Sequence, residues 1–348
     1  ACLVGSEMCI RDSSVFEIIS NSVDEAREGF GNTITVTRFE DKSIEVQDYG
    51  RGIPVEFNRR ENEYNWKLLF CELYAGGKYN TNDGGSYEYS LGTNGLGLCA
   101  TQYASEYMEA EVHSNGYCYH LQFKNGEPVG DMIKEPYGKK DTGTRIKWRP
   151  DLKVFTDIDI PLEYFQDMMR RQSIVNAGIK FVLRNQNGSK FETFEYFYEN
   201  GITDHLKEVV GNNAISSVCT WSGERVGRDR ADQPEYKLKI NAALCFSNKV
   251  QLKEYYHNSS YLEYGGAPDK AVRSAFVSQI DAYIKKNGKY LKSDSKINFQ
   301  DVEDCLVLIV SSFSTVAAYE NQTKKSVTNK FIPVSYTHLR AHETCADL

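Results

Sequence analysis

The sequence lacks long hydrophobic runs, an excess of positive charge and paired cysteines. No stretch of about 18 or more apolar residues occurs, so the sequence predicts no membrane-spanning helix. The formal net charge of −7 gives no basic footprint for nucleic acid, so any role on DNA would need a local basic surface or further parts of a larger protein. The nine cysteines are odd in number and contain no C-x-x-C pair, which indicates reduced thiols in a cytoplasmic protein instead of a disulfide framework.

Two common phosphate-binding patterns are missing as well. The segment Ser90–Ala100 places glycines at 92, 95 and 97, and such a loop can bring bare backbone N–H groups close to an anion. Residues 96–100 are expected to start a helix, and helix N-termini favour anions. The glycine spacing fits neither G-x-x-x-x-G-K-[ST] nor G-x-G-x-x-G, so the P-loop and Rossmann interpretations fail. A phosphate-binding loop of another kind and a flexible turn both remain open.

The chain length predicts two domains. The two terminal segments do not resemble natural protein sequence. At about 150 residues per domain, 348 residues suggest two. The ends "ACLVGSEMCIRDS" and "VSYTHLRAHETCADL" resemble translated sequencing-adapter read-through. We therefore expect residues 1–12 and 334–348 to be non-native tails, and the natural protein to extend further in both directions. Between them we place one domain at 13–210 and a second at 211–333.

The segment that begins at the serine pair 13 and 14 and ends near Gly29 predicts an amphipathic helix. Beside its apolar face, Glu17, Asn21 and Asp24 form a polar line at helical spacing. A carboxylate and an amide one turn apart suit a Mg²⁺ site or a general base beside one. An exposed polar stripe would give the same pattern.

Two strands follow, at 33–39 and 43–50, and together they predict a hairpin. The period of two places Asp48 on the same face as Ile44 and Val46, which is the apolar face. A buried carboxylate needs a partner. That partner is either an arginine or the amino group of a ligand. The turn "GRGIP" comes next and would let a flat ligand approach the backbone.

Taken together, the motifs resemble one family. "FEIISNSVDEA", "VQDYGRGIP", "YAGGKY", "GTNGLG" and "DTGT" occur in this order, and "YENQTKK" follows much later. They resemble the ATPase region of type IIA DNA topoisomerase B subunits, those of DNA gyrase and topoisomerase IV. The first domain of that region belongs to the GHKL superfamily, which also includes MutL, heat-shock chaperones and histidine kinases. The resemblance covers about residues 13–332.

The resemblance implies an α+β protein: a GHKL (Bergerat) ATP-binding sandwich followed by a smaller α/β transducer domain. In the second domain we expect strands near 216–223, 236–247 and 305–314, and an amphipathic helix over 268–288.

The resemblance also implies the site, with ATP and Mg²⁺ as its ligands. Glu17 looks like the general base, Asn21 like the Mg²⁺ ligand, and Asp48 like the acceptor for the adenine amino group. Glu25 and Arg51 match a structural ion pair. The remaining matched positions would contact the nucleotide: Gly52, Ile53, Pro54, Lys78, Tyr87, Gly92, Asn94, Gly95, Leu96, Gly97, Thr144, Gln322 and, at the γ-phosphate, Lys324.

Some positions depart from the family pattern. Tyr49 and Ser20 stand where acidic residues are common, and Asn94 replaces a common histidine. None of these departures removes a catalytic group. Together they leave the sequence unable to distinguish gyrase from topoisomerase IV.

The implied function is ATP hydrolysis coupled to DNA strand passage in a full-length enzyme. The partners would be DNA, a second B subunit joined in an ATP-dependent dimer, and the A subunit, with no membrane. We expect the fragment alone to be weakly active. The alternative is a nucleotide-operated dimerisation clamp of the MutL kind, with little turnover.

Overall fold

The chain divides into two compact units, Ala1–Glu199 and Asn200–Leu348. The computed structural model describes residues 2–73, 96–320 and 325–337, with side chains over 14–73, 96–320 and 325–335. The division lies before helix α5 (Ile202–Val210), whereas the sequence led us to place the boundary after residue 210. Among these residues, no helix is both long and apolar enough to cross a membrane.

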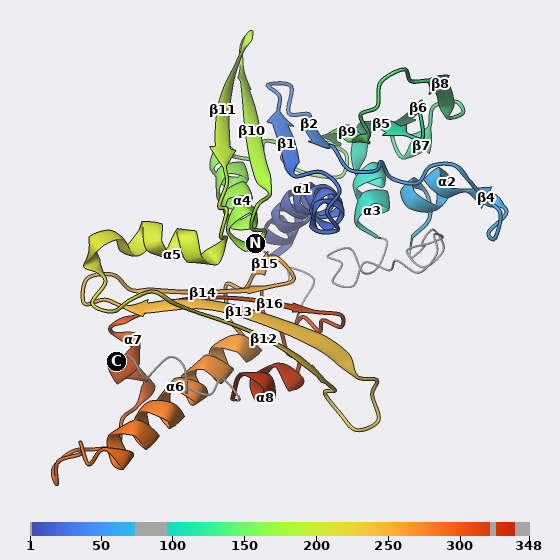
Figure 1. The fold of residues 1–348 in the computed structure, drawn as a ribbon. Coiled ribbons are helices and arrows are strands. Elements are labelled where there is room, and N and C mark those ends of the chain that lie inside the picture. The colour runs from blue at the N-terminus through green and yellow to red at the C-terminus, as the bar shows by residue number, and fades with distance from the viewer. Residues whose placement is uncertain (1, 74–95, 321–324, 338–348) are drawn as a thin grey trace. The chain divides into compact units, whose positions relative to one another are not determined.

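The first unit is built on a nine-stranded sheet with the order β11-β10-β1-β2-β9-β5-β6-β7, in which β8 also pairs with β6 (Figure 1). Only β1 and β10 run parallel among these pairs. The strands of the sheet are β1 (Thr33–Arg38), β2 (Ile44–Asp48), β5 (Ser105–Ser114), β6 (Tyr117–Lys124), β7 (Glu127–Pro128), β8 (Ile133–Pro136), β9 (Gly143–Pro150), β10 (Lys180–Asn187) and β11 (Lys190–Tyr196). A separate short pair is formed by β3 (Phe57–Asn58) and β4 (Glu63–Tyr64).

Helices cover one face of this sheet. They are α1 (Cys2–Arg27), α2 (Asn65–Phe70), α3 (Gly97–Tyr103) and α4 (Leu162–Val175). Apolar side chains of α1, α3 and α4 share one core with alternate residues of the strands, including Ile19, Leu98 and Phe165. The other face of the sheet therefore carries the intervening, more polar residues.

The start of α1 differs from our expectation. We predicted a cap at Ser13 or Ser14, but the helix begins at Cys2 and runs through both serines. The hydroxyl of a capping serine is worth only about 1 kcal/mol, so a serine does not force a helix to begin where the backbone upstream can stay helical. The end of the helix at Arg27, just before Gly29, agrees with the prediction.

The predicted hairpin is confirmed. β1 and β2 pair antiparallel, and the β2 side chains alternate between buried and half-buried. Asp48 is buried on the same face as Ile44 and Val46, as the period of two requires.

The second unit is a five-stranded sheet with the order β12-β13-β16-β14-β15. Within this unit, α5 lies on one face of the sheet and α6 on the other (Figure 1). Its strands are β12 (Cys219–Gly227), β13 (Tyr236–Phe246), β14 (Leu252–His257), β15 (Ser260–Tyr261) and β16 (Leu306–Ser314). Its helices are α5, the 3-10 helix Gly211–Asn213, α6 (Ala267–Lys286), α7 (Phe299–Glu303) and α8 (Phe331–Thr337).

The predicted strands and helix of this unit are confirmed as β12, β13, β16 and α6. Every residue of β16 is buried, because both of its faces are covered. The sequence did not predict β14, which pairs parallel with β16.

Candidate active site

Asp48, the last residue of β2, is a buried carboxylate held by three hydrogen bonds. Its side chain is only 9% exposed. The Ser22 hydroxyl donates to Oδ2 at 2.8 Å, and the backbone N–H groups of Gly50 and Thr144 each donate to Oδ1 at 3.1 Å. Burial raises the pKa of Asp48 despite these three bonds, which act in the opposite direction. In the described part of the chain no arginine pairs with Asp48, so the first of our two alternatives is wrong there.

Thr144 connects Asp48 to the turn that follows β2. It lies at the start of β9, the neighbour of β2 in the sheet. Its backbone N–H reaches Asp48, and its hydroxyl oxygen accepts a hydrogen bond from the Ile53 N–H at 3.0 Å. The turn itself needs glycine, because Gly52 has a φ of +82° and a Cβ there would lie 2.7 Å from the His113 carbonyl oxygen. Asp48, Thr144 and Ile53 are therefore fixed relative to one another.

The expected ion pair between Glu25 and Arg51 is present. Arg51 Nε lies 2.7 Å from Oε1 and Nη2 lies 3.0 Å from Oε2, so the contact is bidentate. The Arg51 N–H also donates to Oε1 at 2.8 Å, and the guanidinium lies 3.9 Å from the centre of the Phe30 ring. The pair anchors the turn to α1.

Glu17 and Asn21 lie one turn apart on α1, and both are half-buried. Asp24, the third member of the predicted polar line, is buried. The line is therefore not the exposed stripe that a purely solvating face would give. Gly97, the first residue of α3, packs directly on Glu17: a Cβ at Gly97 would lie 2.7 Å from the Glu17 Cβ and 3.0 Å from its carboxyl carbon. Glycine at this position makes room for the Glu17 carboxylate.

The other predicted contacts are only partly described. Ile53 and Leu96 are half-buried and Pro54 is exposed. Seven predicted site residues lie outside the described residues, so their placement stays a prediction: Lys78, Tyr87, Gly92, Asn94, Gly95, Gln322 and Lys324.

The donor set fits the two ligands that the motifs imply. A carboxylate has about four acceptor positions, and Asp48 uses three of them. The Thr144 hydroxyl accepts one bond and keeps its own proton to donate. Asn21 can supply an amide oxygen of the kind that Mg²⁺ accepts, and the Glu17 carboxylate lies one turn away, where a general base would be needed.

Sequence reasoning missed two features of this unit. One is Ser22 as the partner of Asp48, a contact that no local pattern indicates. The other is a cavity of about 560 Å³, lined by Glu111, His113, Cys118 and His120 on the opposite face of the sheet and also by Asp48 and Thr144. The sequence signal for this cavity is a pair of alternating patterns, E-x-H at 111–113 and C-x-H at 118–120, on either side of an Asn-Gly turn.

Comparisons with known proteins match the two parts of the chain to two families. Residues 13–154 match the family described as histidine kinase-, DNA gyrase B- and HSP90-like ATPases, and residues 201–338 match the family described as DNA gyrase B. The chain is 27% identical to the DNA gyrase B subunit of Thermotoga maritima over 331 residues, which is 94% of this chain and 51% of that protein. It is 28% identical to the DNA topoisomerase 4 B subunit of Staphylococcus aureus over 319 residues, 90% of this chain and 46% of that protein. The chain thus spans about half the length of the curated relatives it matches.

Solved structures give the same result. The topoisomerase IV ATP-binding domain of Francisella tularensis, in complex with a small-molecule inhibitor, is 26% identical with a TM-score of 0.68, covering 94% of this chain and 85% of that one. The 43K ATPase domain of Thermus thermophilus gyrase B, in complex with an aminocoumarin, is 20% identical with a TM-score of 0.70. The match covers 93% of this chain and 81% of that one. At this lower identity the second match concerns the fold alone.

Proposed function

We propose that the chain belongs to the family of type IIA DNA topoisomerase B subunits and that it is the region of such a protein that binds and hydrolyses ATP. The observation that carries this proposal is the network of Asp48, Thr144 and Ile53, in which a buried carboxylate and a hydroxyl group are held side by side.

This network suits adenine. Asp48 offers its remaining acceptor position to an amino group, and the Thr144 hydroxyl offers a proton to a ring nitrogen. Adenine presents this combination, a 6-amino donor beside the N1 acceptor. Guanine presents the reverse, a carbonyl oxygen beside an N–H, and would leave the buried Asp48 facing another acceptor. Ile53 and Pro54, on the turn that Arg51 anchors, would pack on the flat base.

Hydrolysis is assigned to α1. Glu17 would take the proton from the water that attacks the γ-phosphate, and general-base catalysis of this kind contributes about 10²–10⁴-fold. Asn21 would hold Mg²⁺, which when bound neutralises phosphate charge and orients the phosphates. Gly97 leaves room for the Glu17 carboxylate and so sets where the base lies. The glycines of the 92–97 segment, together with Asn94 and Leu96, would surround the phosphates.

Four further residues complete the proposed site. Lys78 would bind the nucleotide and Tyr87 would lie near the adenine. Gln322 and Lys324 would act at the γ-phosphate. The roles of Lys78, Gln322 and Lys324 rest on the motifs "YAGGKY" and "YENQTKK", and that of Tyr87 rests on its matched position in the family pattern.

In the full-length protein we propose that ATP binding closes a dimer of B subunits and drives DNA strand passage together with the A subunit, in the cytoplasm. The match of residues 201–338 to the DNA gyrase B family favours this role over a MutL-like clamp. Identities of 27% to a gyrase subunit and 28% to a topoisomerase IV subunit leave the proposal open to both enzymes.

Calorimetric titration of the chain with non-hydrolysable ATP and GTP analogues in Mg²⁺, together with phosphate release from ATP, tests the proposal. We expect ATP to bind more tightly than GTP and slow release of phosphate. Binding with no turnover at any protein concentration would favour the clamp, and equal affinity for both nucleotides would reject the proposed role of Asp48 and Thr144.

A further inference from the structure

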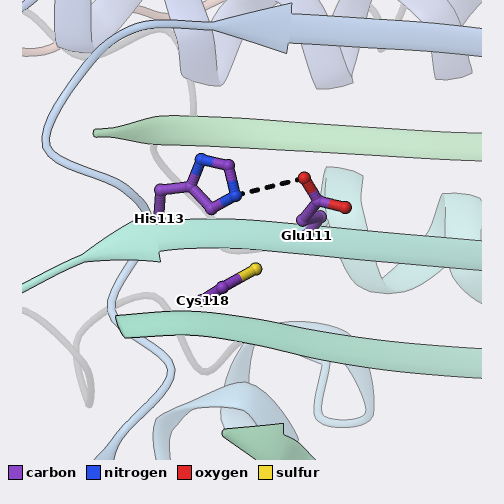
Figure 2. A group of neighbouring side chains, drawn as sticks. All are labelled: Glu111, His113 and Cys118. Atoms are coloured by element: carbon purple, nitrogen blue, oxygen red, sulfur yellow. Dashed lines mark ion pairs between the residues drawn. The ribbon is translucent and has the colours of Figure 1, made fainter. Parts of the chain in front are cut away.

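We propose that Glu111, His113 and Cys118 bind a divalent transition-metal ion, with Zn²⁺ as the ion that their donor atoms fit best. The three side chains come from two neighbouring strands and lie on the face of the sheet opposite α1 (Figure 2). None of the three donors is among the residues proposed to bind the nucleotide, although Asp48 and Thr144 line the same cavity.

The strand register brings the donors together. Glu111 and His113 are two residues apart on β5, so both project from the same face. In the antiparallel pair with β6, His113 is directly opposite Cys118 and Glu111 is directly opposite His120. Directly opposed residues have Cβ atoms only about 4.5–5.5 Å apart, so four donor side chains share one small area of the sheet.

The turn between the two strands fixes this register. It consists of Asn115 and Gly116, whose φ angles are +53° and +78°. Positive φ at both central residues is the signature of the tight two-residue turn that matches the twist of paired strands. A slip by one residue would move the donors to the opposite face, so the turn holds the site in place.

The distances fit a metal ion after a small contraction. One donor atom from each of Glu111, His113 and Cys118 lies within 4.8 Å of the others, and His113 Nε2 lies 3.1 Å from Glu111 Oε1. Four ligands at the usual zinc bond lengths are about 3.3–3.8 Å apart in a tetrahedron. His120 is the group nearest to the fourth position, with Nε2 3.2 Å from the Cys118 sulfur and Nδ1 3.7 Å from Glu111 Oε2.

Neighbouring side chains orient the ligands. Arg145 Nη2 lies 2.5 Å from Glu111 Oε2, which leaves Oε1 on the side of His113, and Arg145 Nη1 lies 3.1 Å from Glu45. The arginine charge is thus shared by two carboxylates. The Tyr137 ring stacks on His113 with centroids 4.0 Å apart. Groups of this kind fix ligand orientation in known metal sites, and losing one lowers metal affinity by about 10–100-fold.

The donor types point to zinc instead of magnesium. A thiol and an imidazole are soft or borderline ligands, which suit Zn²⁺ and similar ions, whereas Mg²⁺ and Ca²⁺ take oxygen ligands. The cavity beside the donors is also lined by Glu135 and Asp141, and its acidic residues outnumber its two basic ones, Lys139 and Arg145, which favours a cation.

The test uses the full chain, stripped of metal by a chelator and then titrated with Zn²⁺ in competition with a chromophoric chelator. Co²⁺ is titrated in parallel, because a thiolate–Co²⁺ absorption band reports a cysteine ligand. We expect one tight equivalent, and at least about tenfold weaker binding in Cys118→Ser and in Glu111→Gln. His120→Ala should weaken binding less than either.

Two controls isolate the site. Cys71→Ser changes a half-buried thiol outside the cluster and should leave the tight equivalent unchanged. His338, His342 and Cys345, outside the described residues, offer a second set of donors by sequence, so Cys345→Ser should also leave it unchanged. Loss of the cobalt band in Cys345→Ser but not in Cys118→Ser, or unaltered zinc affinity in Glu111→Gln, would overturn the proposal. Glu111→Gln decides the question if Cys118→Ser does not fold.

Discussion

The backbone N–H of Thr144 donates to Oδ1 of Asp48 at 3.1 Å, across the neighbouring strands β9 and β2. This bond places the Thr144 hydroxyl beside the carboxylate, while the Ser22 hydroxyl holds Oδ2 from α1. Burial raises the pKa of the Asp48 carboxyl group. In the proposed complex, this carboxylate is the group that would face the adenine base. The arrangement suits ligand recognition better than stability, and the predictions below separate the two.

Glu17→Gln should leave ATP binding within about twofold and lower hydrolysis by about 10²–10⁴-fold, because the amide keeps the shape of the side chain but cannot accept the proton. Calorimetry gives the affinity and a phosphate-release assay gives the rate. Glu28→Gln, an exposed neighbour just after α1, is the matched control and should behave as the parent. Parent-like turnover in Glu17→Gln would remove Glu17 from the mechanism.

Asp48→Asn should weaken ATP binding and reduce the preference for adenine over guanine. The amide oxygen can still accept from Gly50 and Thr144, but the amide nitrogen now occupies part of the acceptor surface and opposes the adenine amino group. A mismatched buried polar group costs about 1–3 kcal/mol, roughly 5- to 150-fold in affinity. Titration of the variant with both nucleotides measures this. An unchanged ATP affinity would make Asp48 a structural carboxylate only.

The same variant should be more stable than the parent at neutral pH when no nucleotide is bound. Burial raises the folded-state pKa of Asp48. The contribution of this group to the free energy of unfolding is therefore fully present below the unfolded-state pKa of about 3.9, and it is lost as pH rises through the folded-state pKa. Asparagine stays neutral, and its amide can donate to the Ser22 hydroxyl in place of Oδ2. The stability difference should therefore grow with pH above about 4 and then level off. Urea unfolding of both proteins across this range measures it, and a difference that shrinks with rising pH would contradict it.

Gly97→Ala should lower hydrolysis through Glu17. The new methyl group would lie 2.7 Å from the Glu17 Cβ and 3.0 Å from its carboxyl carbon, so the Glu17 side chain must move away. A catalytic base displaced by about 1 Å can lose about 10²-fold in rate. Gly138→Ala, where nothing lies within 4 Å of the added Cβ, is the control. If Gly97→Ala hydrolyses ATP at the parental rate, the position of Glu17 does not depend on this glycine.

The second unit should become less stable in mild acid because of His257. Its ring is fully buried between the Ser312 and Ser314 hydroxyls, at 2.8 and 3.0 Å, and burial lowers the pKa of His257 to about 3. The neutral ring contributes stability above the unfolded pKa of about 6.5, and this is lost as pH falls towards 3, at up to about 1.4 kcal/mol per pH unit. NMR titration of the His257 ring and hydrogen exchange of the β16 amides measure the effect. Protonation of the ring near pH 6.5 in the folded protein would contradict it.

Periodicity in the sequence determined much of the fold. The alternation in β2 placed Asp48 on the buried face, and the strand expected near 305–314 is confirmed as β16. The expected fold class, a GHKL-type ATPase domain followed by a second α/β domain, is confirmed by the family matches and by the solved structures. These features are local in the chain or carried by recognisable motifs, so the sequence contains them directly.

Only the tertiary structure decided which side chains meet. The packing of Gly97 on Glu17, the bond from Ser22 to Asp48 and the parallel pairing of β14 with β16 join residues far apart in the chain. The predicted start of α1 at Ser13 or Ser14 was also wrong, because a serine cap is a weak local signal that a continuing helix overrides. The sequence contains Glu111, His113 and Cys118 within eight residues, but whether their side chains meet on one face depends on the register of β5 with β6. Local patterns specify which face a residue occupies, whereas the partner on that face is set by long-range packing.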